Sequence, residues 1–293
     1  MISGARSATL AFLVIAQVTV ASCLPPSNPW TVLSVRERRP GEVPFEEATR
    51  YLWPSADANI VPGPDSLVAR VQIDEEHRAH VEIQDLSTGQ VIPLLEGNAS
   101  LPHWSPDGEY ISCVVWKSMR QHGELTVVDV ATRTVLLDPE IDAAGSTMKW
   151  SPDSGTLAVA GEVYAKPRTM LYTVTVPEGT LRTLDTLEVL ADFEFSWSPN
   201  GRWIAFSRPT KLDHLGEDPV AADLWVADTA TGMRWPLLTT AEWVESNPLW
   251  ITDSTIQVDR IRRDDTELGI EQCIVVELSL AGSALRLGRR PKM

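Results

Sequence analysis

The sequence contains few of the residues that mark a disulfide scaffold, a nucleic-acid-binding protein or a membrane-spanning protein. It has only 3 cysteines in 293 residues, too few to hold a chain of this length together by disulfides. Lysine and arginine number 25 against 40 acidic residues, and a net charge of -15 argues against binding to phosphate backbones. The apolar run Ala8 to Val20 is 13 residues long, too short to span a bilayer comfortably.

Catalytic signatures are also missing from the sequence. There is no Gly-x-Ser-x-Gly, no His-Glu-x-x-His, no Walker loop and no Rossmann glycine fingerprint. His77 and His80 are three residues apart, but on the two sides of an expected hairpin loop and with no third ligand nearby. We therefore predict no metal site, no cofactor and no catalytic residue.

The N-terminus has the features of an export signal. Arg6 precedes the apolar run, and the segment Val20-Ala21-Ser22-Cys23 follows it at once. This segment resembles the lipobox of bacterial lipoproteins, and the resemblance implies a signal peptide over residues 1–22 and acylation of Cys23. An ordinary secretory signal cleaved nearby and an uncleaved anchor are the alternatives. The lipoprotein interpretation predicts an exported protein that faces the periplasm or the cell exterior, with a Pro-rich tether over residues 23–45 and the main domain over residues 46–293.

Tryptophan is abundant, with 11 residues against 4 tyrosines and 5 phenylalanines, and several of the tryptophans recur in a repeated motif. Three near copies of Trp-Ser-Pro-Asp-Gly begin at Trp104, Trp150 and Trp197, and fainter copies lie at Pro62 and Trp250. The acidic or amide positions of the five copies (65, 107, 153, 200 and 253) are separated by 42, 46, 47 and 53 residues. A period of this length indicates a repeat architecture.

The residue types of the motif explain why it recurs. Proline suits the second position of a type I turn, aspartate the third, and glycine the left-handed position that closes a bulged hairpin. A second turn of the type Asp-x-x-Thr-Gly follows at Asp85, Asp129 and Asp228, and strand-forming residues lie between the turns. Each unit therefore predicts four antiparallel strands, the blade of a β-propeller.

The motif Trp197 to Gly201, followed by Ile204-Ala205-Phe206-Ser207, resembles the repeat of the TolB-like propellers, also called the WD40-like or PD40 repeat. The resemblance covers roughly residues 58–290 and implies an all-β propeller fold. It does not include the N-terminal α/β domain of TolB, so it carries no implication of that protein's specific role. Five units are recognisable. Strand-like segments at Trp30–Val35 and Ala48–Trp53 leave two alternatives open, part of a sixth blade or closure against the last unit.

The repeated residues are predicted to be structural, because equivalent positions call for one explanation. Packing between neighbouring blades explains the tryptophans, and turn formation explains the residues that follow them. The set is Trp104, Pro106, Asp107, Gly108, Trp150, Pro152, Asp153, Trp197, Pro199, Asn200, Gly201 and Trp250.

Binding residues are expected where the units differ, on the face where the loops between second and third strands open. The loop 208–222 is an insertion that lengthens its unit and carries Arg208, Lys211 and His214. Trp116, Tyr164 and Trp243 fall in or beside loops of the same face, where aromatic rings either pack or bind. Charge does not narrow the choice, since acidic residues are spread over both faces. Cys113 and Cys273 are expected to be free thiols.

Two functions follow from these patterns. The first is a non-enzymatic binding scaffold in the cell envelope, which recognises a protein or glycan partner through its loop face and touches the membrane only through its lipid. The second is a propeller enzyme of the lyase, lactonase or quinoprotein type with a site at the central channel, for which His103 is the best placed residue.

Overall fold

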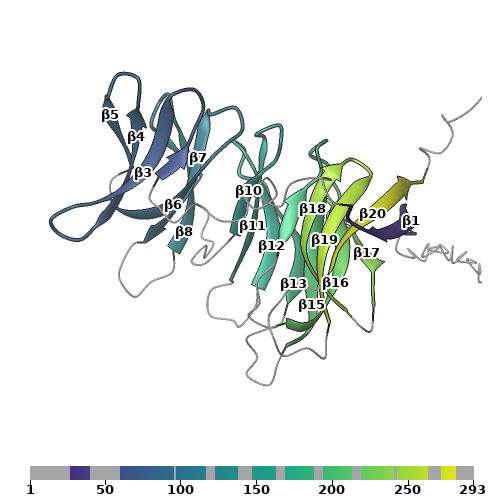
Figure 1. Ribbon diagram of the computed structural model, residues 1–293. Helices are drawn as coiled ribbons and strands as arrows, with labels where there is room; N and C mark the ends of the chain where they lie inside the picture. Colours follow the sequence, from purple (N-terminus) through teal and green to yellow (C-terminus); the bar gives the residue numbers. More distant parts are fainter. Residues whose placement is uncertain are drawn as a thin grey trace, which may run out of the picture.

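The computed structural model describes residues 27–39, 60–95, 97–116, 123–137, 147–162, 169–187, 194–212, 219–240, 243–262 and 272–281. These residues form five four-stranded antiparallel sheets, arranged as successive blades along the molecule (Figure 1). The predicted all-β propeller with five recognisable units is confirmed. No helix among these residues is long and apolar enough to cross a membrane.

Four of the blades are built from strands that follow one another in the chain. Blade 1 contains β2 (Ile60–Pro62), β3 (Leu67–Ile73), β4 (Ala79–Asp85) and β5 (Val91–Leu95). Blade 2 contains β6 (Asn98–Trp104), β7 (Tyr110–Trp116), β8 (Gly123–Asp129) and β9 (Val135–Leu137). Blade 3 contains β10 (Thr147–Trp150), β11 (Thr156–Glu162), β12 (Thr169–Thr175) and β13 (Leu181–Leu187). Blade 4 contains β14 (Phe195–Trp197), β15 (Trp203–Leu212), β16 (Pro219–Asp228) and β17 (Arg234–Leu238).

Blade 5 combines the two ends of the described chain. Its strands are β18 (Trp243–Thr252), β19 (Thr255–Arg262), β20 (Gln272–Leu280) and, outermost, the N-terminal strand β1 (Trp30–Glu37). β1 is antiparallel to β20, with Trp30 opposite Leu280 and Glu37 opposite Ile274. The segment Trp30–Val35 therefore joins the last unit, and the expected tether over residues 23–45 includes a propeller strand. The other candidate segment, Ala48–Trp53, lies outside the described residues.

Four hydrophobic clusters hold the five blades together, and each joins one blade to the next. Ile111 and Val81 belong to the cluster between blades 1 and 2, and Leu157 and Val127 to the cluster between blades 2 and 3. The other two clusters join blades 3 and 4, and blades 4 and 5. Within the described ranges no cluster joins blade 5 to blade 1, and these two blades lie at opposite ends of the row (Figure 1). The five blades therefore form an open row.

The repeat tryptophans link successive blades by hydrogen bonds as well as by packing. The indole Nε1 of Trp150 donates to the carbonyl of His103 at 3.1 Å, and that of Trp197 donates to the carbonyl of Lys149 at 2.9 Å. Each acceptor residue directly precedes the repeat tryptophan of the blade before. Trp104 makes the corresponding bond to the carbonyl of Val61 at 3.2 Å, and a side chain at Gly63 would collide with its ring.

The repeat turns are closed by their own side chains. Ser105 Oγ donates to Asp107 Oδ1 at 2.6 Å and accepts a hydrogen bond from the amide of Tyr110. Ser151 with Asp153 and Ser198 with Asn200 form the same hydrogen bond. The position that follows adopts the left-handed conformation, with φ of 75° at Gly108, 62° at Ser154 and 70° at Gly201. These contacts account for the serine, the acidic or amide residue and the glycine of the motif as turn-forming residues.

Each blade has two ends, which differ in the segments that join its strands. The turn end holds the Ser-Pro-Asp-Gly and Asp-x-x-Thr-Gly turns, and the loop end holds the second-to-third-strand loops and the connections between blades. Cys113 and Cys273 are free thiols, the first buried and the second half-buried.

Candidate functional site

The insertion of the fourth unit is in large part a hairpin extension. Strands β15 and β16 are each ten residues long, whereas the corresponding strands of blades 1 to 3 are seven residues long. The pairing continues from Arg208 opposite Asp223 to Leu212 opposite Pro219, with irregular register near Pro209 and Lys211. The two strands run past their neighbours at the loop end of blade 4 (Figure 1). Residues that distinguish the fourth unit from the others therefore lie on a paired hairpin that protrudes from the blade.

A buried carboxylate fixes the arginines at the base of this hairpin. Asp185, whose side chain is fully buried, accepts a hydrogen bond from Arg208 Nε at 2.6 Å and forms an ion pair with Arg234 at 3.1 Å. The Arg208 guanidinium lies over the ring of Trp225, 5.3 Å from its centroid. Because Asp185 comes from blade 3 and both arginines from blade 4, the cluster locks the two blades together and fixes the direction of Arg208.

A second arginine of this type lies one blade further on. Arg260 occupies the same position in β19 as Arg208 in β15, and it donates from Nε and Nη2 to the fully buried carboxylate of Glu245 at 2.8 and 2.9 Å. Its guanidinium lies 5.6 Å from the ring centroid of Trp243. Ser207 Oγ donates to the Glu245 carbonyl at 2.6 Å, so blades 4 and 5 meet beside this pair. Two Arg-carboxylate-Trp groups therefore lie side by side at this part of the loop end.

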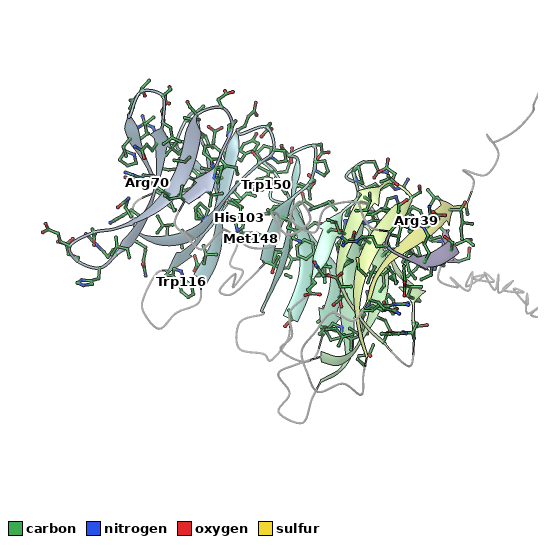
Figure 2. All side chains as sticks on the ribbon, viewed as in Figure 1. Arg39, Arg70, His103, Trp116, Met148 and Trp150 are labelled. Atoms are coloured by element: carbon green, nitrogen blue, oxygen red, sulfur yellow. The ribbon has the colours of Figure 1, made fainter. Side chains whose placement is uncertain are left out.

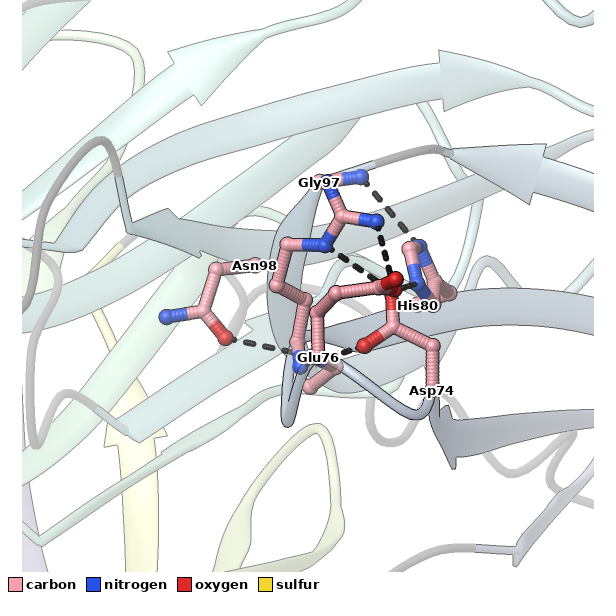
Figure 3. A network of polar contacts seen from close by, with 7 residues as sticks. Asp74, Glu76, His80, Gly97 and Asn98 are labelled. Atoms are coloured by element: carbon pink, nitrogen blue, oxygen red, sulfur yellow. Dashed lines mark hydrogen bonds and ion pairs between the residues drawn. The ribbon is translucent and has the colours of Figure 1, made fainter.

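Blade 1 carries a polar network at its own loop end (Figure 3). Asp74 accepts hydrogen bonds from the Arg78 amide at 2.8 Å, from Arg78 Nε at 2.9 Å and from His80 Nε2 at 2.7 Å. Although desolvation acts to raise it, these hydrogen bonds hold the pKa of Asp74 well below its ordinary value. The Gly97 amide donates to His80 Nδ1, and the Ala79 amide donates to the side chain of Asn98. The network ties the hairpin of blade 1 to the connection that enters blade 2, and we interpret it as structural.

The inner strands bring a second set of polar residues together. His103 on β6 and Lys149 on β10 each directly precede a repeat tryptophan, and Figure 2 shows His103 beside Met148 and Trp150 in the middle of the molecule. Burial lowers the pKa of His103 to about 4, with a smaller contribution from the charge of Lys149. Burial also lowers the pKa of Lys149 to about 8, against the opposing effect of Glu194. Lys149 Nζ donates to the carbonyl of Phe195 at 2.5 Å, so it bridges blades 3 and 4.

The structure places two of the predicted binding residues at successive blade borders and leaves the others apart or undescribed. Arg208 lies at the border between blades 3 and 4, with Asp185, and Trp243 lies beside Arg260 in blade 5. Trp116 is half-buried at the loop end of blade 2, packed against the cluster between blades 2 and 3. Lys211 is described only through its backbone pairing, opposite Ala221. Tyr164 and His214 lie outside the described residues.

Sequence reasoning missed Asp185, Glu245 and Trp225. Asp185 and Glu245 each lie among several other acidic residues in the predicted connections between blades. Their residue types therefore did not single them out as site residues. The alternation in β16 does carry a signal for Trp225, since it lies opposite Phe206 on the face that packs toward blade 3. The equivalence of Arg208 and Arg260 was also visible, because both are the sixth residue of a second strand.

Comparison with solved structures gives many matches to β-propellers, and no family model matches the chain. TolB from Acinetobacter baumannii is 19% identical over 75% of this chain and 53% of its own, with a TM-score of 0.43. An oligogalacturonate lyase in complex with manganese is 14% identical over 75% of this chain and 64% of its own, with a TM-score of 0.50. The tricorn protease is 17% identical over 73% of this chain and 20% of its own, with a TM-score of 0.52. The chain thus spans less than two thirds of each of these proteins, and it is distantly similar in structure to TolB-like and other β-propeller proteins.

Proposed function

We propose that this protein is a non-enzymatic binding scaffold of the cell envelope, held at a membrane by an acylated Cys23, that recognises a protein partner through the loop end of blades 4 and 5. Cys23 lies outside the described residues, and the anchor is inferred from the lipobox-like segment Val20 to Cys23. A glycan is the alternative ligand for the same surface.

The observation that carries this proposal is the β15–β16 hairpin. Its two strands have ten residues each, whereas the second and third strands of the other blades have seven to nine, so this element extends beyond the repeat. Its base is held rigid by Asp185 and by the Trp225 ring beneath Arg208. A rigid protrusion loses little conformational entropy on binding, which favours recognition at this place.

Deletion of the extension tests the site. Residues 209–222 would be replaced by Asn-Gly, because Arg208 and Asp223 lie directly opposite each other in the hairpin and this dipeptide favours a two-residue turn. Crosslinking of the membrane-anchored protein should capture a partner that the deletion variant fails to capture. The same partners at the same yield in both proteins would rule out this surface as the binding site. A thermal unfolding profile close to wild type serves as the control for folding.

The anchor has a separate test. Cys23→Ala should release the protein from the membrane fraction or leave it as an unprocessed precursor, whereas Cys273→Ala, which removes a thiol of blade 5, should leave it in place. Membrane retention in the Cys23→Ala variant would contradict the lipoprotein assignment.

A second candidate function is an enzyme with its site at the inner strands, favoured by the proximity of His103 and Lys149 there. A lysine whose pKa is lowered toward neutral is suited to proton transfer or to holding an anionic group. His103→Ala and Lys149→Met should abolish any turnover that the purified chain shows toward acidic oligosaccharides or peptides. Unchanged turnover in both variants would remove this candidate.

A further inference from the structure

Arg208 uses only one of its guanidinium nitrogens in hydrogen bonds or ion pairs with other described residues. Its Nε donates to Asp185 at 2.6 Å, and neither Nη1 nor Nη2 has a partner among these residues. The equivalent Arg260 uses two nitrogens, Nε and Nη2, on the single carboxylate of Glu245. The side chain of Arg208 is also more exposed than that of Arg260, at 27% against 12%. Arg208 therefore keeps N–H donors for a molecule outside the chain.

The carboxylate that holds Arg208 is satisfied without these donors. The buried Asp185 accepts from the Thr186 amide at 2.8 Å and pairs with Arg234 Nη2 at 3.1 Å, in addition to the bond from Arg208. Arg234 is itself fixed by a hydrogen bond from Nη1 to the carbonyl of Leu184 at 3.1 Å. Two arginines on one carboxylate leave this group with one positive charge in excess. A second carboxylate could therefore bind to Arg208 without displacing Asp185.

The guanidinium of Arg208 is held in a fixed direction. Its face lies over the ring of Trp225, which in turn packs against the cluster between blades 3 and 4. Asp223 lies opposite Arg208 in the strand pairing, but no ion pair joins the two in the described parts of the chain. An arginine can donate two parallel N–H bonds to a carboxylate, and a side chain that is already ordered loses little entropy on binding.

We infer that the partner is acidic, and that a carboxylate side chain of a peptide segment binds to Nη1 and Nη2 of Arg208 at the base of the β15–β16 hairpin. This inference rests on the proposed function for the binding surface and adds the chemistry of the partner. A glycan carboxylate is the less favoured source, because Arg208 already covers the ring of Trp225 on which a sugar could stack. The net charge of -15 opposes binding of acidic peptides in general, so such binding would have to come from a local group.

The inference is tested with two capped peptides of equal length, one of glutamate only and one of glutamine only. Each is titrated into the full chain in a non-ionic detergent, and binding is measured by calorimetry. The glutamate peptide should bind and the glutamine peptide should not. Arg208→Lys keeps a cation beside Asp185 but loses the planar fork, so it should weaken binding of the glutamate peptide by about 10-fold. No binding of the glutamate peptide would overturn the inference.

Two matched arginines serve as controls for this titration. Arg202 lies at the turn end of the same blade, donates from Nη2 to Asp228 at 3.0 Å and lies 4.8 Å from the ring centroid of Trp203. Arg234 shares Asp185 with Arg208, so Arg234→Lys disturbs the same buried carboxylate. Arg202→Lys and Arg234→Lys should each change the affinity by less than about twofold. Losses equal to that of Arg208→Lys would mean that the effect is unspecific or comes from destabilisation, and would overturn the assignment.

Two further measurements separate this inference from the proposed function. If crosslinking captures a partner that the hairpin deletion loses but Arg208→Lys retains in full, the binding surface stands and the role of Arg208 is wrong. If the deletion retains the partner, the proposed surface is wrong, whereas the peptide titration still decides whether Arg208 binds a carboxylate. A glucuronate oligosaccharide of the same charge is titrated alongside the peptide, and tighter binding of the oligosaccharide would overturn the choice of a peptide.

Discussion

Blades 2 to 4 and blade 5 carry the same repeat tryptophan but attach it in different ways. Trp104, Trp150 and Trp197 each donate to a carbonyl of the preceding blade, whereas the Nε1 of Trp250 has no hydrogen-bond partner among the residues that the structure describes. At that border the Trp250 amide instead donates to Ser196 Oγ. The repeat therefore determines where the indole ring lies, and the position of the neighbouring strand determines whether the indole N–H forms a hydrogen bond.

Aromatic packing takes the place of the missing indole hydrogen bond in blade 5. Trp30 packs at 5.1 Å from Trp203 and at 5.7 Å from Trp250, and Trp203 also packs against Trp235. Glu245 and Arg260 bring the only charged pair of this border whose carboxylate is fully buried, within the part of the chain that the structure describes. A fully buried carboxylate also joins blades 3 and 4 through Asp185, so the two borders differ in the indole hydrogen bond and in the aromatic packing around Trp30.

Loss of Glu245 is expected to have the largest effect. Glu245→Ala leaves Arg260 without its carboxylate while only 12% of the Arg260 side chain is exposed, and this should destabilise the protein by ~3–5 kcal/mol. Chemical denaturation measures the change. Glu277→Ala is the control, because it removes an exposed partner of Arg36 at 3.9 Å and should cost about 0.5 kcal/mol or less. A small effect of Glu245→Ala would mean that blade 5 is held by aromatic packing alone.

Two tryptophan substitutions test the difference in hydrogen bonding directly. Trp150→Phe removes the donor to His103 and leaves a carbonyl unpaired, so it should destabilise the fold by ~1–2 kcal/mol more than Trp250→Phe. Both variants lose similar ring volume, and both wild-type rings are buried. Equal destabilisation of the two variants would show that the indole hydrogen bond of Trp150 does not contribute to the free energy of unfolding.

Acid should weaken the middle blades through His103. Its pKa of about 4 lies below the ordinary value of 6.5 because of burial and the charge of Lys149. Between these two values the unfolded chain binds more protons than the folded one, so stability falls as pH falls from 6.5 to 4 and does not fall further below 4 on this account. The expected loss is ~1–2 kcal/mol, since His103 is only half-buried. The difference in unfolding free energy between wild type and His103→Gln, followed across this range, should change by that amount. A constant difference would contradict the assignment.

The smallest expected effect concerns the last position of the Asp-x-x-Thr-Gly turn, where the backbone is left-handed. Gly89 and Gly232 adopt left-handed φ values of 74° and 75°, but Arg133 occupies the equivalent position of blade 2 with φ of 58°. Arg133→Gly should stabilise the protein by ~0.5–1 kcal/mol, because the strain of a side chain there outweighs the added freedom of the unfolded chain. Gly89→Ala, which meets no neighbouring atom, should cost a similar amount. Thermal unfolding of the two variants gives the comparison.

The parts of the fold that were predictable from the sequence are those made by local chemistry. Ser105, Asp107 and Gly108 form their turn through contacts with one another and through their own backbone conformation. The motif therefore predicts a strand reversal, and its period predicts the blades. The first unit departs slightly, since its left-handed residue is Asp65, which aligns with Asp107 of the next unit and not with the left-handed Gly108. The pairing of β1 with β20 corresponds to one of two alternatives that the sequence left open, closure against the last unit, because strand character at Trp30–Val35 does not by itself identify a partner more than two hundred residues away.

The candidate site was predictable only in outline. Arg208 and Trp243 could be chosen because they lie where the units differ, and the length of the insertion pointed to blade 4. The residues that fix them come from neighbouring strands or blades, as Asp185 does for Arg208. Such contacts depend on how adjacent sheets are offset, and single-sequence patterns do not encode that offset.

The pairing of β1 with β20 also sets the order in which the protein can be completed. Trp30 is among the earliest described residues made and Leu280 among the last, so β1 cannot pair with β20 until almost the entire domain has been synthesised. During that time Leu33 and Val35, exposed even in the finished sheet, belong to a strand with both edges open, which favours association with other chains. Closing a loop of this length adds only a slowly growing entropic cost, so the delay concerns timing more than final stability. The fold is therefore completed only when β20, the last strand of blade 5 to be synthesised, pairs with β1.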